Sequence, residues 1–297
     1  MGAFILSNNK KLYYSFILIL VTLFFISIYY AFRPTLRYAV FAGYNPNGII
    51  EPYVVTYLKE LNKHTDGIVY ITDSPIQPEE LKKLNNINIL YHYHQRHNEY
   101  DWGSYKRGYN WLKTNGYLDN AYELIFANDS TYAPITSFSP MFKDMDKRQE
   151  LDFWGNTQNT HFKPHLQSYF LVFRKKVINS HKFQQFIQSI TKLPDHSLYI
   201  LQYEVELTSY LSQLGYKYDS YIPYQKLAHL PIPDKNSYPL TLIKHHNNQF
   251  LKKRTFTEKL MILENIDDLL LYLKQNSPKT YLNILASKHP RLSHLKP

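Results

Sequence analysis

The chain has 297 residues, of which 44% are hydrophobic and 20% are charged. These values are ordinary for a globular protein and exclude a disordered chain or a protein with many membrane spans. The absence of cysteine excludes disulfides, thiolate metal ligands and a cysteine nucleophile. The net charge of +10 is concentrated from Lys226 onward, which favours anionic partners such as phosphates or lipid headgroups. A solvated basic surface is the alternative, and no nucleic-acid-binding module is recognisable.

A long uncharged segment lies near the N-terminus. Residues 13–32 read YYSFILILVTLFFISIYYAF, and a helix of twenty residues spans a hydrocarbon core of about 30 Å. Tyrosines at both ends and flanking basic residues are typical of a membrane-spanning helix. We therefore predict a short tail over 1–12 and one transmembrane anchor over 13–32. A cleaved signal peptide is the alternative, although no small-x-small cleavage site follows. Basic residues nearly balance across the segment, so charge does not decide its orientation.

The remaining residues, 37–297, are predicted to form one α/β domain, because apolar β-prone runs alternate with stretches of helical periodicity. This alternation predicts a mostly parallel sheet with helices on both faces. Ligands of such sheets bind at the carboxyl ends of the strands, so the loops 43–48, 96–103 and 128–134 are expected at the site. Strands are expected at 38–43, 67–72, 87–91, 123–127 and 218–222, and helices at 51–63, 78–84, 102–116, 183–190, 198–214, 258–263 and 267–273.

Three polar residues follow the strand expected at 123–127. Asn128, Asp129 and Ser130 place an amide, a carboxylate and a hydroxyl at a strand end. Such groups suit the binding of a divalent ion such as Mg²⁺ or Mn²⁺, or of the phosphates of a nucleotide. The structural alternative is an Asx-turn that closes the strand.

An acidic pair, Glu204 and Glu206, is expected to open an amphipathic helix. Acidic residues in a first turn are favoured by the helix dipole, so a plain N-terminal cap is the alternative. Glu204 lies three residues before the apolar Leu207, and residues at that spacing share a helix face. We therefore expect the carboxylate of Glu204 to point inward.

Two further sets of polar residues are candidates for binding. Arg96, Asn98 and Asp101 lead into a predicted helix and suit the clamping of a nucleotide or sugar, with Asp101 as a simple N-cap being the alternative. His165 and Gln167 precede an apolar strand. A lone histidine is more often structural than a ligand.

Four stretches stand in a characteristic order: NEYDWGSYKRGYNWL, ELIFANDSTYAPITSF, DFWGNTQNTHFKPHLQSYFLVFRKKVINS and YEVELTSYLSQLGYKYDSYIP. Together they resemble the rhamnan synthesis F family of bacterial polysaccharide enzymes, over about 38–253. The resemblance implies a GT-A-like, Rossmann-type glycosyltransferase domain that uses a nucleotide-activated sugar, often a deoxyhexose such as rhamnose. Asp152 and Trp154 of DFWG, and Lys252 near the end of the matching part, join the residues expected to bind substrate.

The layout is also similar to that of inverting GT-A transferases, which carry a DxD-type motif after the fourth strand and an ED dyad at a late helix. The resemblance implies that Asp129 holds a divalent ion or the donor diphosphate, and that Glu204, which follows Tyr203, is the general base. Two departures from the family are present. The NDS motif keeps only one carboxylate, and Glu99 stands where the family usually has glycine.

These features lead us to expect a membrane-anchored transferase that moves a sugar from a nucleotide-sugar donor to a glycan or lipid-linked acceptor of a cell-surface polysaccharide or lipopolysaccharide. Because bacterial nucleotide sugars are cytoplasmic, we expect a single-pass protein of the inner membrane with its domain on the cytoplasmic side and no role for nucleic acid. One alternative is a non-catalytic, tethered glycan-binding or scaffold subunit. A membrane-associated phosphotransferase is a weaker alternative.

Overall fold

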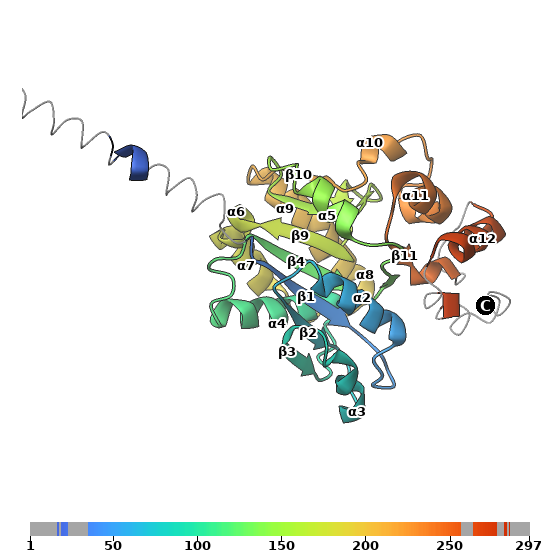
Figure 1. Cartoon of the computed structure of the whole chain (residues 1–297), viewed down its shortest axis with the longest axis horizontal. Helices are drawn as coiled ribbons and strands as arrows, with labels where there is room; N and C mark the ends of the chain where they lie inside the picture. Colours follow the sequence, from blue (N-terminus) through green and yellow to red (C-terminus); the bar gives the residue numbers. More distant parts are fainter. Residues whose placement is uncertain are drawn as a thin grey trace, which may run out of the picture. The chain divides into compact units, whose positions relative to one another are not determined.

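The computed structural model describes residues 35–256 and 264–277, together with residues 17, 19–22, 282, 283 and 285 (Figure 1). The tail expected at 1–12 and the helix expected at 258–263 lie outside the described residues. So does most of the anchor expected at 13–32, of which only residues 17 and 19–22 are described, all of them helical. Within the described part of the chain, no helix is both long enough and apolar enough to cross a membrane.

A seven-stranded sheet lies at the centre of the unit that begins at Leu36, with the strand order β10-β6-β9-β4-β1-β2-β3. Only β9 runs antiparallel to its neighbours, which are β4 and β6; the other pairs in this sheet are parallel. The predicted α/β class with a mostly parallel sheet is therefore confirmed. The strands are β1 (Arg37–Gly43), β2 (Gly67–Thr72), β3 (Ile89–His94), β4 (Glu123–Asn128), β6 (Phe153–Gly155), β9 (Phe170–Arg174) and β10 (Tyr218–Ser220).

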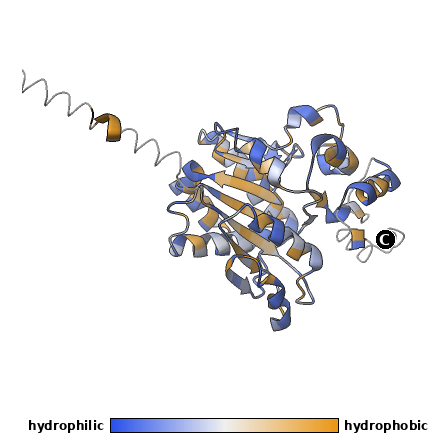
Figure 2. Cartoon of the chain, viewed as in Figure 1, coloured by the Kyte–Doolittle hydropathy of each residue, from blue (hydrophilic) through white to orange (hydrophobic). Residues whose placement is uncertain are grey.

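Every residue of β1, β2 and β4 is buried, as expected for central parallel strands that helices cover on both faces. Successive side chains of a strand point to opposite faces, and β1 shows this directly. Phe41 belongs to one apolar cluster and Val40 to another. Figure 2 shows these apolar strands between helices whose outer faces are hydrophilic.

The two faces of the sheet are covered by different helices. On the face of Phe41 lie α2 (Pro52–Asn62) and α5 (Ser139–Met145), and on the face of Val40 lie α4 (Tyr100–Thr114), α7 (His181–Ser189) and α9 (Glu206–Gln213). Helix α12 (Ile266–Asn276) packs against α11 (Pro239–His246), away from the sheet (Figure 1). Helix α4 approaches β1 very closely, because a Cβ at Gly108 would lie 2.3 Å from a methyl group of Val40. Glycine at this position therefore allows the helix to pack on the sheet.

A short antiparallel ladder brings the C-terminal part of the chain to the end of β4. Strand β11 (Leu251–Lys252) pairs with β5 (Thr131–Tyr132), and β5 follows β4 after two residues. The remaining elements are β7 (Gln158–Asn159), β8 (His165–Leu166), α3 (Pro78–Leu81), α6 (Lys175–Ile178), α8 (His196–Tyr199), α10 (Tyr224–Leu227), the 3-10 turns η1 (Lys82–Leu84), η3 (Lys235–Ser237) and η4 (Lys253–Phe256), and the π-helical turn η2 (Ile200–Val205).

Candidate active site

A cleft of about 1050 Å³ opens at the carboxyl ends of β1, β2 and β4 and beside the start of the antiparallel β9. This is the edge of the sheet where ligands of α/β proteins bind, and the volume suits a ligand of nucleotide-sugar size. The structure brings most of the predicted site residues together here. Those lining the cleft are Arg96, Asn98, Asp101, Asn128, Asp129, Ser130, His165, Gln167, Glu204 and Lys252.

Two predicted substrate contacts are wrong. Asp152 precedes β6 at the opposite end of that strand from the cleft, and its carboxylate accepts a hydrogen bond from Lys176 Nζ (3.1 Å). Trp154 is fully buried in the core, with its ring 5.9 Å from that of Phe142 and 5.8 Å from that of Phe170. The DFWG motif therefore supports the sheet and contributes neither of these side chains to the cleft.

Asn128 organises the end of β4. Its Oδ1 accepts hydrogen bonds from the Ser130 amide (3.0 Å) and the Ser130 hydroxyl (2.6 Å), and its Nδ2 donates to Asp101 Oδ2 (2.6 Å). The first two contacts form the Asx-turn expected as the structural alternative. That turn coexists with a place in the cleft, because all three residues of the NDS motif line it.

Asp129 is buried, and three groups that can donate hydrogen bonds lie near its Oδ2. The Tyr44 amide (3.3 Å) and the Tyr53 hydroxyl (3.4 Å) donate to this oxygen, and Lys253 Nζ lies 3.7 Å from it. Burial raises the pKa of the carboxyl, whereas the positive charge of Lys253 opposes that shift. The carboxylate therefore ties the ends of β1, β4 and β11 together.

Asp101 lies in the first turn of α4 and faces the cleft. The N-cap of that helix is Glu99, so the alternative interpretation of Asp101 as an N-cap is wrong. Burial, together with the negative charge of Asp129, raises the pKa of Asp101 to about 7. Asp101 can therefore exchange a proton near neutral pH. Glu99, which replaces the family's glycine, forms an ion pair with Arg107 on the same helix.

Arg96 and Asn98 are positioned by the loop that follows β2. Asp73 Oδ1 accepts the amides of His97 (2.6 Å) and Asn98 (2.8 Å), and Arg96 donates to the Asp73 carbonyl oxygen (3.0 Å). The Arg96 guanidinium lies 5.0 Å from the centre of the Tyr44 ring. A cation and an exposed aromatic ring thus lie together on one wall of the cleft.

Glu204 lies in the π-helical turn η2, between α8 and α9. The expectation that it opens a helix is wrong, because the helical run begins at His196 with Asp195 as its N-cap. The side chain points inward as expected. Ser168 donates its amide (2.7 Å) and its hydroxyl to Oε2, and His165 Nε2 lies 3.5 Å from Oε1.

These contacts decide the charge of Glu204. Burial alone would raise its pKa, but the nearby His165 ring, the hydrogen bonds from Ser168 and the positive charge of Lys252 outweigh burial and leave the pKa below its ordinary value. The carboxylate is therefore ionised at neutral pH. Glu206, two residues later, is half exposed and pairs with Lys163 (2.6 Å) outside the cleft.

His165 and Gln167 are both buried and hydrogen-bonded. His165 Nδ1 donates to the Lys163 carbonyl oxygen (2.8 Å), which leaves Nε2 facing Glu204. Burial lowers the pKa of His165, but Glu204 outweighs it and the net shift is upward. Gln167 Oε1 accepts from Thr157 and Asn236 (2.8 Å each).

A run of three basic residues, Lys252, Lys253 and Arg254, lines the cleft beside the NDS motif, and only the first was predicted from the sequence. Burial, with Arg254 second, lowers the pKa of Lys252 to about 8. Arg254 pairs with Asp234 at the rim of the cleft. The three basic residues are visible in the sequence, but their position beside the NDS motif depends on the β5–β11 ladder. Strands of two residues are too short to be predicted from sequence periodicity.

The residues present fit a divalent ion poorly. Among the described residues, no group of three or more histidine and acidic side chains is arranged to hold a metal. The amide oxygen of Asn128 is occupied by Ser130, and the carboxylate of Asp129 already faces Lys253. The ammonium group of Lys252 lies 3.5 Å from the Ser130 hydroxyl, where it would repel a cation bound at the motif.

Comparisons with curated proteins find the virulence protein VirA of Vibrio anguillarum, 30% identical over 118 residues. This match covers 39% of the chain, and the chain spans about 37% of the length of that relative.

Three solved structures show weak similarity of fold. TarS (residues 1–349) of S. aureus has a TM-score of 0.35 and 12% identity, over 88% of this chain and 87% of that chain. A cytidylyltransferase of Leptospira borgpetersenii has a TM-score of 0.38 and 12% identity, over 62% of this chain and 75% of that chain. Core-mannan synthase A of Aspergillus fumigatus, in its Mn/GDP form, has a TM-score of 0.32 and 10% identity, over 50% of this chain and 63% of that chain. The family model described as rhamnan synthesis protein F matches residues 68–290, well over half of the sequence, and the chain therefore belongs to that family.

Proposed function

We propose that this protein is a glycosyltransferase of GT-A type that moves a sugar from a nucleotide-sugar donor to a growing cell-surface glycan. Membership of the rhamnan synthesis F family supports this proposal. The observation that carries it is the content of the cleft: one pocket at the carboxyl ends of the strands holds a basic run, Lys252–Arg254, and an ionised, buried carboxylate, Glu204. The basic run can bind the negatively charged diphosphate of the donor. The carboxylate of Glu204 can remove the proton of the attacking hydroxyl.

The donor diphosphate is assigned to the end of the cleft formed by the NDS motif. Asn128 and Ser130 supply an organised hydrogen-bond network there, and Asp129 holds Lys253 and the backbone of Tyr44 in place. Preorganised groups of this kind stabilise charge without reorganising during the reaction. Arg96 and Asn98 lie on the neighbouring wall and suit contacts with the rest of the nucleotide sugar.

The acceptor is assigned to an aromatic part of the cleft. The side chains of Tyr100 and Phe162 are 45% and 67% exposed although both are large and apolar, and their flat faces suit a sugar ring. Both residues have left-handed backbone conformations, with φ of 51° and 69°, and strain of this kind concentrates at functional sites. His196 and Tyr199 stand beside Tyr100, with ring centroids 4.9 and 5.1 Å away.

In the proposed reaction, an acceptor hydroxyl oxygen attacks the anomeric carbon of the donor sugar. Glu204 removes the proton of that hydroxyl as the new carbon–oxygen bond forms. The bond between the anomeric carbon and the diphosphate breaks, its electron pair stays on the diphosphate oxygen, and the configuration is inverted. Ser168 and His165 orient the base through their contacts with its two carboxylate oxygens.

The transmembrane anchor at 13–32 and the inner-membrane location, with the domain on the cytoplasmic side, are part of this proposal. They are supported by the twenty uncharged residues of that segment and by the cytoplasmic supply of nucleotide sugars in bacteria. A rhamnose-type deoxyhexose donor is supported by the family. A reporter fused after Pro297 should be active in the cytoplasm, and a periplasmic reporter would overturn the assigned orientation.

One observation favours a second function, that of a non-catalytic glycan-binding subunit: the NDS motif has a single carboxylate, and that carboxylate faces Lys253. Thermal unfolding of the full-length protein with a panel of nucleotide sugars tests donor binding. A donor at a hundred times its Kd should add about 2.7 kcal/mol to the free energy of unfolding. If no member of the panel raises the Tm while isolated glycans do, the protein is a glycan-binding subunit.

A further inference from the structure

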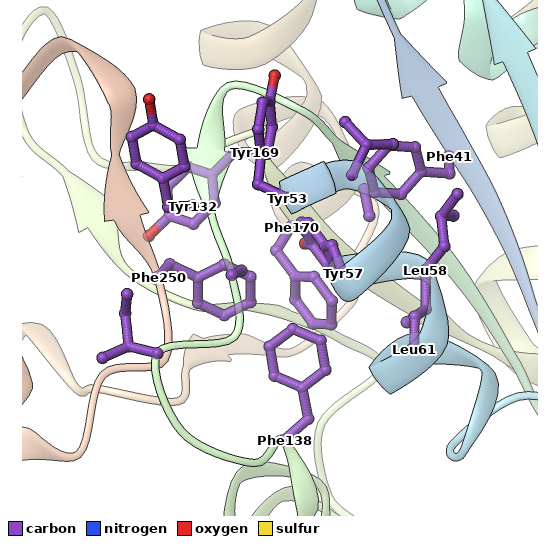
Figure 3. Packing of buried hydrophobic residues seen from close by; sticks show 14 of the residues in the cluster. Phe41, Tyr53, Tyr57, Leu58, Leu61, Tyr132, Phe138, Tyr169, Phe170 and Phe250 are labelled. Atoms are coloured by element: carbon purple, nitrogen blue, oxygen red, sulfur yellow. The ribbon is translucent and has the colours of Figure 1, made fainter. Parts of the chain in front are cut away.

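The basic run is anchored to the core by the residue that precedes its strand. Phe250 is buried, and its ring lies 5.2 Å from Phe138, 5.1 Å from Phe170 and 5.4 Å from Tyr169. Figure 3 shows these rings packed together beneath the segment that continues into β11. A chain anchored in this way cannot move its next residues far, so Lys252, Lys253 and Arg254 stay at the cleft.

The backbone of the run is also bonded to the NDS motif. Lys252 pairs with Thr131 in the β5–β11 ladder, and the amide of Lys253 donates to the Ser130 carbonyl oxygen (3.1 Å). These contacts place the side chains on both sides of the motif. The ammonium of Lys252 lies 3.5 Å from the Ser130 hydroxyl, and that of Lys253 lies 3.7 Å from Asp129.

Each cation of the run has an acidic neighbour in the free protein: Lys253 lies 3.7 Å from Asp129, and Arg254 pairs with Asp234. Lys252 faces Asp101, Glu204 and Asp234, yet burial and Arg254 still lower its pKa. Two ammonium groups and a guanidinium beside a strand end form a site that gains by taking up an anion. A diphosphate has several acceptor oxygens with which these three groups could bond.

We propose that Lys252, Lys253 and Arg254 bind the diphosphate of the donor in the role that a divalent cation would otherwise fill, so that donor binding and transfer need no metal. The inference rests on the proposed function. The poor fit of the NDS motif to a metal supports it, because the groups that would be ligands already contact Ser130 and Lys253.

The same residues would serve the departing diphosphate. As the bond to the anomeric carbon breaks, its electron pair moves onto the diphosphate oxygen, and negative charge grows there. Ammonium and guanidinium groups already in place stabilise such charge at a partly buried site more strongly than they would in water. The basic run would therefore contribute to the rate of transfer and also to donor affinity.

Equilibrium binding of UDP, GDP, CDP and dTDP to the full-length protein tests the inference, each nucleotide with EDTA and again with Mg²⁺ or Mn²⁺. At least one should bind in EDTA, with a Kd that the metals change by less than about threefold, or ~0.7 kcal/mol. Replacing Lys252 with alanine should weaken that binding about 10- to 100-fold, the usual effect of losing a charge-assisted hydrogen bond. Lys252→Arg should restore it, and Lys244→Ala, on the exposed end of α11, should leave it unchanged.

The outcomes separate the two claims. Binding that appears only with metal and vanishes in EDTA overturns this inference and leaves the proposed function standing. The absence of binding under either condition overturns both. Because the EDTA comparison uses only the wild-type protein, it remains decisive even if a lysine variant fails to fold.

Discussion

The ammonium of Lys252 lies 4.0 Å from the centre of the Tyr169 ring. Tyr169 is buried and directly precedes β9, the antiparallel strand beside β4, so this contact joins the basic run to the middle of the sheet. A cation at this distance is attracted by the negative face of the ring. The ring therefore helps to hold the charge of Lys252 in the cleft.

Donor affinity should depend on the charge of Lys252. The pKa of this residue is lowered to about 8, so the free protein carries the charge below that pH and loses it above. Affinity for a nucleoside diphosphate should be full below pH 8 and fall as pH rises through that value. In Lys252→Arg, whose guanidinium stays charged, the decline should vanish. Identical pH curves for the two proteins would show that Lys252 does not bind the ligand.

The pH dependence of kcat/KM should identify the base. The pKa of Glu204 is lowered from 4.5, so activity that requires its ionised form should persist as pH falls from neutral to about 5. Asp101 is the rival base, with a pKa of about 7. An acid limb centred near pH 7 would therefore transfer the assignment to Asp101.

The exposed aromatic residues of the cleft, Tyr100 and Phe162, should contribute to acceptor binding and not to donor binding. Replacing Phe162 or Tyr100 with alanine should raise KM for the acceptor about 2- to 10-fold, in line with ~0.5–1.5 kcal/mol for an aromatic contact, and leave donor Kd unchanged. Leu271→Ala is a matched control, because the exposure of Leu271 (56%) lies between those of Tyr100 and Phe162, but this residue is on α12 outside the cleft. Equal changes in donor and acceptor binding would indicate a general distortion of the pocket.

Phe250 should be among the costliest residues to truncate. It is buried among several rings, and loss of such a side chain removes its contacts and leaves a cavity, at about 3–5 kcal/mol. Urea unfolding of Phe250→Ala should show that loss in the free energy of unfolding. A loss below about 1 kcal/mol, ordinary for a surface substitution, would mean that the basic run is not anchored there.

Much of the sheet could be predicted because β1, β2 and β4 are continuous apolar runs separated by helical periodicity. The position of the NDS motif followed from β4, since a parallel strand leads its next residues to the ligand-binding edge. The inward direction of the Glu204 side chain could be predicted because Glu204 lies three residues before the apolar Leu207, on the same helix face. The π-helical turn that holds it has no comparable sequence pattern.

Other parts of the site depend on long-range packing. β5 and β11 have two residues each, too few for any periodicity, so the place of Lys253 and Arg254 beside Asp129 could not be predicted. Asp152 and Trp154 were misassigned for a related reason. A motif near a strand does not by itself reveal which of its side chains face the cleft and which face the core.

Turnover measured with Glu204→Gln beside Glu206→Gln tests the proposed glycosyltransferase activity at its chemical step. The full-length proteins are incubated with nucleotide sugars, and release of the nucleoside diphosphate is followed. Loss of a positioned base should lower the rate of Glu204→Gln by at least about 10²-fold, whereas Glu206→Gln, whose residue pairs with Lys163 outside the cleft, should keep the wild-type rate. Equal, mild effects at both positions, or no release by the wild-type protein with any donor, would contradict the assignment of this cleft as a glycosyltransferase site.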